Sequence, residues 1–140
     1  MAKRPIKPLK AKLWKLFSLY IKLKFSKDGQ RTQCYTCDAY LKIGSKNCQL
    51  GHWLPKGTYQ NHYFNEDNVR PQCGRCNNWG LGEAETFRRR LQAEIGESKI
   101  DWLYETRKDG GTRKPEWYDE RIEHYKEELK ILKSRFNLEY

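Results

Sequence analysis

Long apolar runs are missing from this sequence. No stretch of its 140 residues is apolar enough over enough length to cross a membrane, and the N-terminus lacks the apolar segment and small-residue cleavage site of a secretory signal. A disulfide framework is also unsupported, because four of the five cysteines form Cys-x-x-Cys pairs, which fit metal-bound thiolates in a reducing compartment. We therefore expect a cytoplasmic protein.

Acidic residues are scarce at the N-terminus. Residues 1–33 hold ten basic residues and one acid, Asp28, in a chain whose formal net charge is +10. Clustered lysines and arginines bind polyanions by releasing counterions from phosphates, so we expect a nucleic acid partner. An anionic lipid surface is the alternative for the basic segment 9–25, but its lysines are scattered around the helical wheel, and we expect no membrane partner.

The pattern of apolar residues predicts helices at both ends of the chain. Helical spacing from Leu9 to Phe25 predicts a long first helix that ends near Asp28-Gly29. Pro115 suits the first turn of a last helix. The last helix carries an apolar seam at Tyr118, Ile122, Tyr125, Leu129, Leu132 and Phe136. This seam packs against the first helix or, as the alternative, against a second copy of the chain.

The middle of the chain changes to short segments rich in Gly, Asn, Cys and aromatic residues. We expect a strand pair at 41–43 and 48–52 and a further strand at 69–73. A helix should follow Cys76, with Gly96 as its C-cap, and Ser98 is a candidate cap for a short helix after it. The predicted fold is a small α+β protein: a basic arm and helix over 1–30, a zinc-stabilised core over 31–96 and a helical segment over 97–140.

Two Cys-x-x-Cys pairs predict a structural zinc site. Cys34 and Cys37 form the first pair, and Cys73 and Cys76 form the second. Two such turns supply the four thiolates of a closed tetrahedral Zn²⁺ site. The fifth cysteine, Cys48, stands alone, and we expect a small buried side chain there rather than a further ligand.

Three polar residues inside this zinc-stapled segment suit phosphodiester hydrolysis. A neutral His52 imidazole can take a proton from an attacking water at neutral pH, and a divalent ion beside it would polarise the phosphoryl oxygen. Asn77 can face such an ion, although an N-cap is its structural alternative. Asn68 belongs to a turn, from which its amide can bond across the loop and orient His52; for His52 itself the alternative is a packed histidine.

The order Cys-x₂-Cys, His, Asn, Cys-x₂-Cys-Asn resembles the HNH (His-Me finger, ββα-metal) endonucleases, and its spacing is similar to that of phage endonuclease VII. The likeness is closer to the phage lambda NinG/Rap recombination endonucleases, through the runs 49–53, 63–73 and 76–77 together with Pro55. The resemblance implies that His52 is the general base, Asn77 a ligand of a catalytic Mg²⁺ or Mn²⁺, and Asn68 the structural Asn of the motif. It also implies the four-cysteine zinc site and, for a phage-encoded protein, the host cytoplasm.

Two positions depart from the family pattern. Many HNH enzymes have an ion-binding Asp or His directly before the base, where this chain has Gly51. Gln49 is a candidate to supply an oxygen instead, and phosphates and water can complete the shell of Mg²⁺. Glu83 stands where similar phage proteins tend to have Asn, and it can add an ion ligand or cap a helix. His62 can reach the cleft, but we expect it to be a surface residue.

Basic residues around the core are the candidates for DNA contact. The lysines of the first helix are favoured, because residues 1–33 hold ten cations and a single acid. The run Arg88-Arg89-Arg90 is less favoured, because acidic residues lie close to it in the sequence. The candidates are Lys10, Lys12, Lys15, Lys22, Lys24, Lys56, Arg70, Arg75, Arg88, Arg89 and Arg90.

The combined hypothesis is a metal-dependent DNA endonuclease, and the resemblance alone implies branched recombination intermediates such as Holliday junctions and D-loops. A homodimer would suit a two-fold junction. Two alternatives stay open: a non-catalytic zinc-dependent DNA-binding protein, and an HNH nicking or homing endonuclease specific for a sequence. The hydrolytic hypothesis requires His52 and Asn77 to meet at the same hydrated cation.

Overall fold

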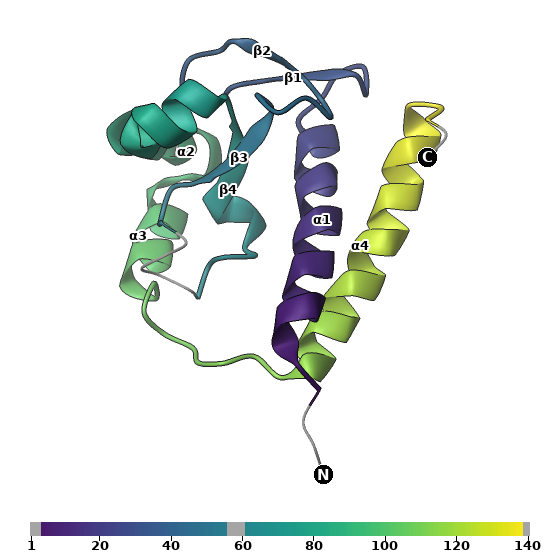
Figure 1. The fold of residues 1–140 in the computed structure, drawn as a ribbon. Helices are drawn as coiled ribbons and strands as arrows, with labels where there is room; N and C mark the ends of the chain where they lie inside the picture. The colour runs from purple at the N-terminus through teal and green to yellow at the C-terminus, as the bar shows by residue number, and fades with distance from the viewer. Residues whose placement is uncertain (1–3, 56–60, 139–140) are drawn as a thin grey trace.

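The computed structural model describes residues 4–55 and 61–138 and has an α+β architecture. Two long helices, α1 (Ile6–Lys24) and α4 (Pro115–Arg135), lie side by side (Figure 1). Beside them lie two small antiparallel sheets and two shorter helices, α2 (Ala84–Ile95) and α3 (Glu97–Glu105). None of the helices in the described ranges is long and apolar enough to span a lipid bilayer.

Helix α1 buries one apolar stripe, as its spacing predicts. Leu13, Phe17 and Ile21 are fully buried in the main core. The helix starts a few residues earlier than Leu9 and ends before the predicted Asp28-Gly29 turn. The turn after the helix is stabilised by Asp28, whose carboxylate accepts hydrogen bonds from the backbone N–H groups of Gln30 and Arg31, at 2.8 and 2.9 Å.

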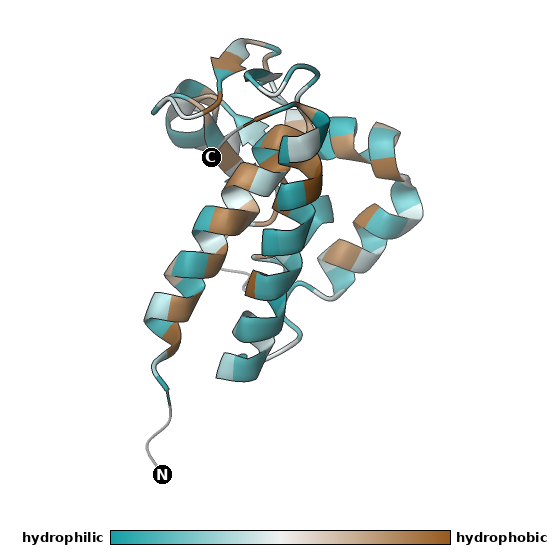
Figure 2. Cartoon of the chain, turned by 90° about the vertical axis from the view of Figure 1, so that its right-hand side faces the viewer, coloured by the Kyte–Doolittle hydropathy of each residue, from teal (hydrophilic) through white to brown (hydrophobic). Residues whose placement is uncertain are grey.

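Helix α4 begins at Pro115, as predicted, and its apolar seam packs against α1. The rings of Phe17 and Tyr125 meet edge to face with centroids 5.3 Å apart. The face of α4 turned toward the viewer in Figure 2 is mostly hydrophilic. Because α1 covers the seam, the alternative in which the seam pairs with a second copy is wrong. Whether the chain forms a homodimer is not decided by this packing, and the homodimer stays a prediction.

The strands pair differently from the expectation. Strand β1 (Arg31–Gln33) pairs with β2 (Tyr40–Lys42), and β3 (Gln49–His52) pairs with β4 (Val69–Gln72), both antiparallel. The predicted pairing of 41–43 with 48–52 is therefore wrong. The first cysteine pair forms the turn of the β1–β2 hairpin, where Cys34 N–H donates to Ala39 O at 2.8 Å, and β3 is thereby left to pair with a strand later in the chain.

The segment after β4 is helical, as predicted, but in three pieces. A π-helical turn, η2 (Arg75–Trp79), and a 3₁₀ turn, η3 (Leu81–Glu83), precede α2. Gly96 ends α2 at a φ of 93°, a conformation that glycine adopts without strain. Helix α3 starts directly after Gly96, so Ser98 lies inside the helix and the prediction of a Ser98 cap is wrong.

Candidate functional site

The four paired cysteines converge. Their sulfur atoms all lie within 4.8 Å of one another. Four sulfurs bound at about 2.3 Å to one tetrahedral ion would lie about 3.8 Å apart. The Cys37 and Cys73 sulfurs are 3.8 Å apart, and the Cys76 N–H points at the Cys73 sulfur over 3.4 Å. The donor set and its spacing therefore fit a zinc ion.

The surroundings of the thiols shift their pKa values in opposite directions. Burial alone would raise the pKa of Cys34, but hydrogen bonds from the Cys73 backbone and from Thr36 outweigh it and lower the pKa to about 6. Burial raises the pKa of Cys76 to about 12. Cys48 is 3% exposed and packs against this cluster without belonging to the group of four, so the expectation for it is confirmed.

The β3–β4 hairpin separates two faces. Successive side chains of a strand point to opposite faces, so Gln49 and position 51 face one way while Leu50 and His52 face the other. Leu50 packs in the core against α1. Arg70, opposite Gly51, pairs with Glu94 of α2. One face of the hairpin is therefore covered by α1 and the other by α2.

His52 belongs to a cluster of three mutually contacting rings on the α1 face. Trp14 stacks on the imidazole, with centroids 5.5 Å apart and planes at 17°, and the Tyr63 ring lies 5.0 Å away. The Tyr63 carbonyl lies 2.9 Å from His52 Nε2. Because a carbonyl only accepts, Nε2 carries a proton, and the neutral imidazole has its lone pair on Nδ1. The sequence pattern gave no sign that Trp14 contacts His52.

Asn68 bridges the loop after β3, as the sequence hypothesis proposed. Its side chain is fully buried. Oδ1 accepts from Leu54 N–H at 2.8 Å, and Nδ2 donates to the carbonyls of Leu54 and His62 at 3.3 and 3.1 Å. Asn68 thereby fixes the residue directly before Tyr63, whose carbonyl holds His52. It orients the imidazole through the loop, without touching it.

Asn77 lies within the π-helical turn η2 and is not its N-cap, which is Gly74. π-helical turns are rare and often occur at functional sites. Asn77 Nδ2 donates to Gln49 Oε1 at 3.0 Å and lies 3.4 Å from Leu50 O. Asn78 Nδ2 also donates to Gln49 Oε1, at 3.2 Å. Both lone pairs of Gln49 Oε1 thus have donors, so Gln49 acts as a positioner of Asn77 and fits poorly as an ion ligand.

His52 thus contacts the rings on the α1 side of the hairpin, while Asn77 contacts the Gln49 side chain and the Leu50 carbonyl. They are connected along the outer edge of β3. Pro71 lacks an N–H, so its partner Leu50 must turn its backbone groups away from β4, toward that edge. The Leu50 carbonyl there is the group that Asn77 contacts. His52 follows about 7 Å further along the same edge.

The departure at Gly51 has a structural cause. A Cβ atom at position 51 would lie 1.6 Å from Oε1 of Gln72. Gln72 is held by hydrogen bonds from its Nε2 to Thr36 Oγ1 and Gly82 O, at 2.9 and 3.0 Å. Its Oε1 is buried and has no hydrogen-bond partner among the described residues. An acidic ligand at position 51 is thus sterically excluded by Gln72.

The predicted DNA contacts divide into exposed and structural residues. Arg70 is 2% exposed and bonds both oxygens of Glu94, so its assignment to DNA is wrong. Arg90 ties α2 to Asp38 and to the Tyr35 carbonyl beside the zinc cluster. Lys56 lies outside the described residues. The exposed candidates are Lys12, Lys15, Lys24, Arg75, Arg88 and Arg89, while Lys10 and Lys22 are half-buried.

The surface position expected for His62 is wrong. The side chain is 3% exposed. Its Nδ1 accepts from Asn65 Nδ2 at 3.1 Å, and its Nε2 donates to Thr106 Oγ1 at 2.8 Å. Burial lowers its pKa. His62 therefore pins the loop before Asn65 to α3. Glu83 is exposed, has a left-handed φ of 50° and makes no side-chain cap of α2.

Sequence comparison links the chain to known proteins. The Septu protein PtuB of Bacillus thuringiensis is 40% identical over 58 residues, which are 41% of this chain and 22% of that protein. The match thus covers well under a third of the length of this curated relative. No solved structure matches it significantly. Residues 5–135 match the family described as Bacteriophage Lambda NinG protein, which is nearly the whole chain. The chain belongs to the bacteriophage lambda NinG family.

Proposed function

We propose that this protein is a metal-dependent DNA endonuclease of the HNH type, with a ββα-metal core formed by β3, β4 and η2. The observation that carries the proposal is the His52 imidazole, whose Nε2–H is fixed on the Tyr63 carbonyl at 2.9 Å. This contact makes Nδ1 the basic nitrogen, and stacking on Trp14 fixes the direction in which it faces. A general base needs this defined tautomer and orientation.

The outer edge of β3 is the proposed location of the scissile phosphate. A phosphate across this edge would meet His52 on one side and Asn77 on the other. Asn77 turns its Nδ2 toward Leu50 O and Gln49 Oε1, so its Oδ1 is the atom suited to a cation. A bound Mg²⁺ or Mn²⁺ would polarise the phosphoryl oxygen and stabilise the leaving oxygen. The zinc cluster would hold β4 and η2 in register.

In this mechanism the residues of the chain have separate tasks. His52 Nδ1 takes a proton from the attacking water. The Tyr63 carbonyl stabilises the resulting imidazolium by accepting from Nε2–H, as the orienting partner of a catalytic histidine does. Asn68 holds the loop that carries this carbonyl. The preference for branched DNA, such as Holliday junctions and D-loops, rests on membership of the NinG family and the likeness to the Rap endonucleases.

The closest rival is a zinc-dependent DNA-binding protein without catalysis. It is favoured by one observation: Gly51 supplies no ligand, and Gln49 Oε1 already accepts two hydrogen bonds. Under this alternative the Asn77 contacts are structural and His52 is a packed histidine.

An incision assay separates the two functions. The zinc-loaded protein is incubated with synthetic four-way junctions, D-loops and linear duplexes of the same sequence, with Mg²⁺ or Mn²⁺. The proposal expects metal-dependent incision of the branched substrates that falls at least about 100-fold in His52→Ala. His124→Ala is the matched control, because His124 is exposed on α4. Binding without incision would support the rival, and cutting of linear duplex at one sequence would support a nicking or homing enzyme.

A further inference from the structure

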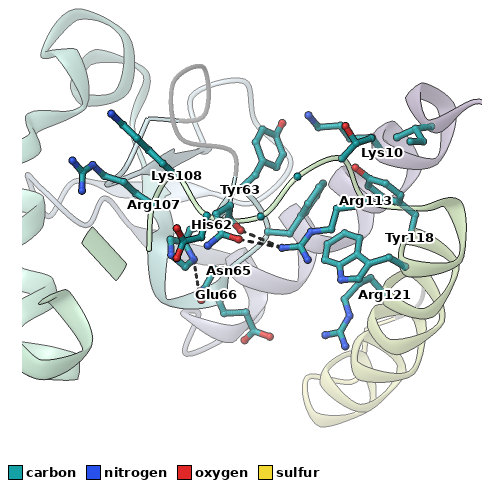
Figure 3. A pocket seen from close by; sticks show the side chains of 18 of the residues that line it. Lys10, His62, Tyr63, Asn65, Glu66, Arg107, Lys108, Arg113, Tyr118 and Arg121 are labelled. Carbon is teal, nitrogen blue, oxygen red and sulfur yellow. Dashed lines mark hydrogen bonds between the residues drawn. The ribbon is translucent and has the colours of Figure 1, made fainter. Parts of the chain in front are cut away.

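A large cavity lies beside the proposed catalytic histidine, between α1, the loop 61–66, the end of α3 and α4. Its volume is about 960 Å³, at the upper end of the range for ligand sites. Figure 3 shows Arg107 and Lys108 on one side of it and Lys10, Arg113 and Arg121 on the other. We propose that this cavity, here called the basic groove, binds an unpaired DNA strand next to the cleavage site.

The charge of the basic groove suits a phosphate backbone. Five cationic side chains line it, against the two carboxylates Glu66 and Asp109. Glu66 is already neutralised locally, since its oxygens accept from Lys24 Nζ and Tyr125 Oη at 3.1 and 2.8 Å. The cations come from three separate parts of the chain and meet only in the folded protein.

Aromatic rings alternate with these cations. The Lys10 ammonium lies 4.4 Å from the centre of the Tyr63 ring, and the Arg113 guanidinium lies 4.5 Å from the Trp117 ring. Trp102, which also lines the groove, is 54% exposed. Grooves that combine cations with aromatic faces bind single strands, because unpaired bases stack on the rings while phosphates meet the cations. Paired bases in a duplex have their faces covered, so a duplex gains nothing from these rings.

The position of the groove connects it to the chemistry. Tyr63 lines the groove with its side chain, and its backbone carbonyl accepts from His52 Nε2 at 2.9 Å. Trp14 and Tyr63 both contact the His52 ring, and their own rings are 5.3 Å apart. A strand in the groove therefore leads directly to the proposed base. This inference deepens the proposed function, on which it rests for the meaning of the cleavage site, and it explains how a branch with an unpaired arm would be held.

The floor of the groove is rigid. His62, buried beneath it, is bonded to Asn65 and Thr106, and the Asn61 amide donates to Thr106 O at 2.7 Å. Arg113 lies within 3.4 Å of Asn61 O, which holds its guanidinium over the groove. Arg113 and the floor of the groove are thus held in place before a ligand binds, which reduces the entropic cost of binding.

The test measures binding of a labelled oligothymidylate of about 10 nucleotides, a length within the range bound by single-strand proteins. Fluorescence anisotropy is recorded at several salt concentrations, without added Mg²⁺ or Mn²⁺. In Arg113→Gln/Arg121→Gln, we expect at least about tenfold weaker binding and a salt slope reduced by about 1.4, because each lost phosphate contact of a single strand removes about 0.7. Trp102→Ala should weaken binding at least about fivefold.

The matched control is Lys126→Gln/Lys130→Gln. It removes two cations of α4, the helix that carries Arg121, which pair with Glu123 and Glu127 outside the groove. This variant should keep the wild-type affinity and slope. Circular dichroism and zinc content confirm that each variant is folded. Unchanged oligothymidylate binding in the groove variants would overturn the proposal. So would an equal loss for a blunt duplex, since the groove would then be a general phosphate surface.

Binding and incision measured side by side on the wild-type protein separate this inference from the nuclease proposal. Oligothymidylate binding by a wild-type protein that cuts no DNA would support the groove while the nuclease fails. Incision of junctions by a protein whose groove variants bind single strands normally would support the nuclease while the groove fails.

Discussion

The Oε1 atom of Gln72 occupies the space in which a side chain at position 51 would begin, 1.6 Å from an ideal Cβ on Gly51. The two residues lie on the same face of the hairpin, one on each strand. A side chain at position 51 cannot coexist with this conformation of Gln72. Gly51 and Gln72 are therefore a coupled pair, because only glycine fits at position 51 while the Gln72 amide occupies this space.

This coupling predicts a non-additive pair of substitutions. Gly51→Ala should destabilise the fold by about 2–3 kcal/mol, because overpacking forces Gln72 out of its bonds to Thr36 and Gly82. In a Gln72→Ala background, the same change should cost less than about 1 kcal/mol. Urea unfolding of the four proteins at saturating zinc measures the cycle. If Gly51→Ala lowers the free energy of unfolding equally in both backgrounds, the added Cβ is accommodated without strain against Gln72, and the coupling is refuted.

Asn77→Asp is expected to lower incision, although a carboxylate is a better ligand for a divalent ion than an amide. Asn77→Asp adds a carboxylate, which divalent ions prefer. It also replaces an Nδ2 donor by an oxygen that faces Gln49 Oε1 and Leu50 O. We expect incision to fall at least about tenfold, because the side chain turns away from two acceptors. Asn137→Asp, which adds the same carboxylate at an exposed position after α4, is the control. Increased incision by Asn77→Asp would contradict the positioning inferred from these contacts.

Removal of zinc should unfold the centre of the chain before its helices. The β1–β4 segment contains strands of three or four residues, which cannot be stable without the metal. We expect a single zinc per chain by mass spectrometry. Chelation should cause loss of amide protection in residues 31–55 and 61–83, while α1 and α4 keep part of theirs. Cys48→Ser should retain the zinc, and loss of the metal in that variant would make Cys48 a ligand.

Stability should depend on the protonation of His62. Burial lowers its pKa, so the folded protein holds it neutral while the unfolded chain, with a pKa near 6.5, binds a proton. The folded state therefore loses stability as the pH falls through about 6.5 toward the lowered value. His62→Gln should be less stable at pH 7.5, and the difference from wild type should shrink at pH 5.5.

Denaturant unfolding at both pH values in excess zinc tests this dependence, because the acid sensitivity of the thiolates is common to both proteins and cancels in the difference. A difference that stays constant with pH would mean that His62 titrates alike in the folded and unfolded states.

Substitution of Arg70 should lower stability without changing DNA affinity, whereas substitution of the α1 lysines should weaken DNA binding without changing stability. Arg70→Ala should lower the free energy of unfolding by about 2–3 kcal/mol, because it breaks a buried pair whose partner Glu94 is partly exposed. The affinity of the folded fraction for duplex DNA should not change. Lys12→Gln/Lys15→Gln should leave stability within about 0.5 kcal/mol and reduce the salt slope for duplex by about 1.8. A salt slope that falls in Arg70→Ala instead would restore it as a DNA contact.

The sequence alone determined the features that depend on spacing between near neighbours. The two cysteine pairs, the apolar seam of α4 and the Pro115 and Gly96 boundaries follow from local chemistry and helical periodicity. The bridging role of Asn68 was also predictable, since a buried amide in a turn bonds across its own loop.

Only the tertiary structure decided which strands pair, which arginine is buried and which ring stacks on His52. Each of these depends on contacts between segments far apart in the chain, such as Trp14 with His52 or Arg70 with Glu94. A local pattern carries no information about such a partner, because a cation or a ring has the same sequence signature in solvent and in a core. The basic groove likewise exists only where three distant segments meet, since folding alone brings their charges together.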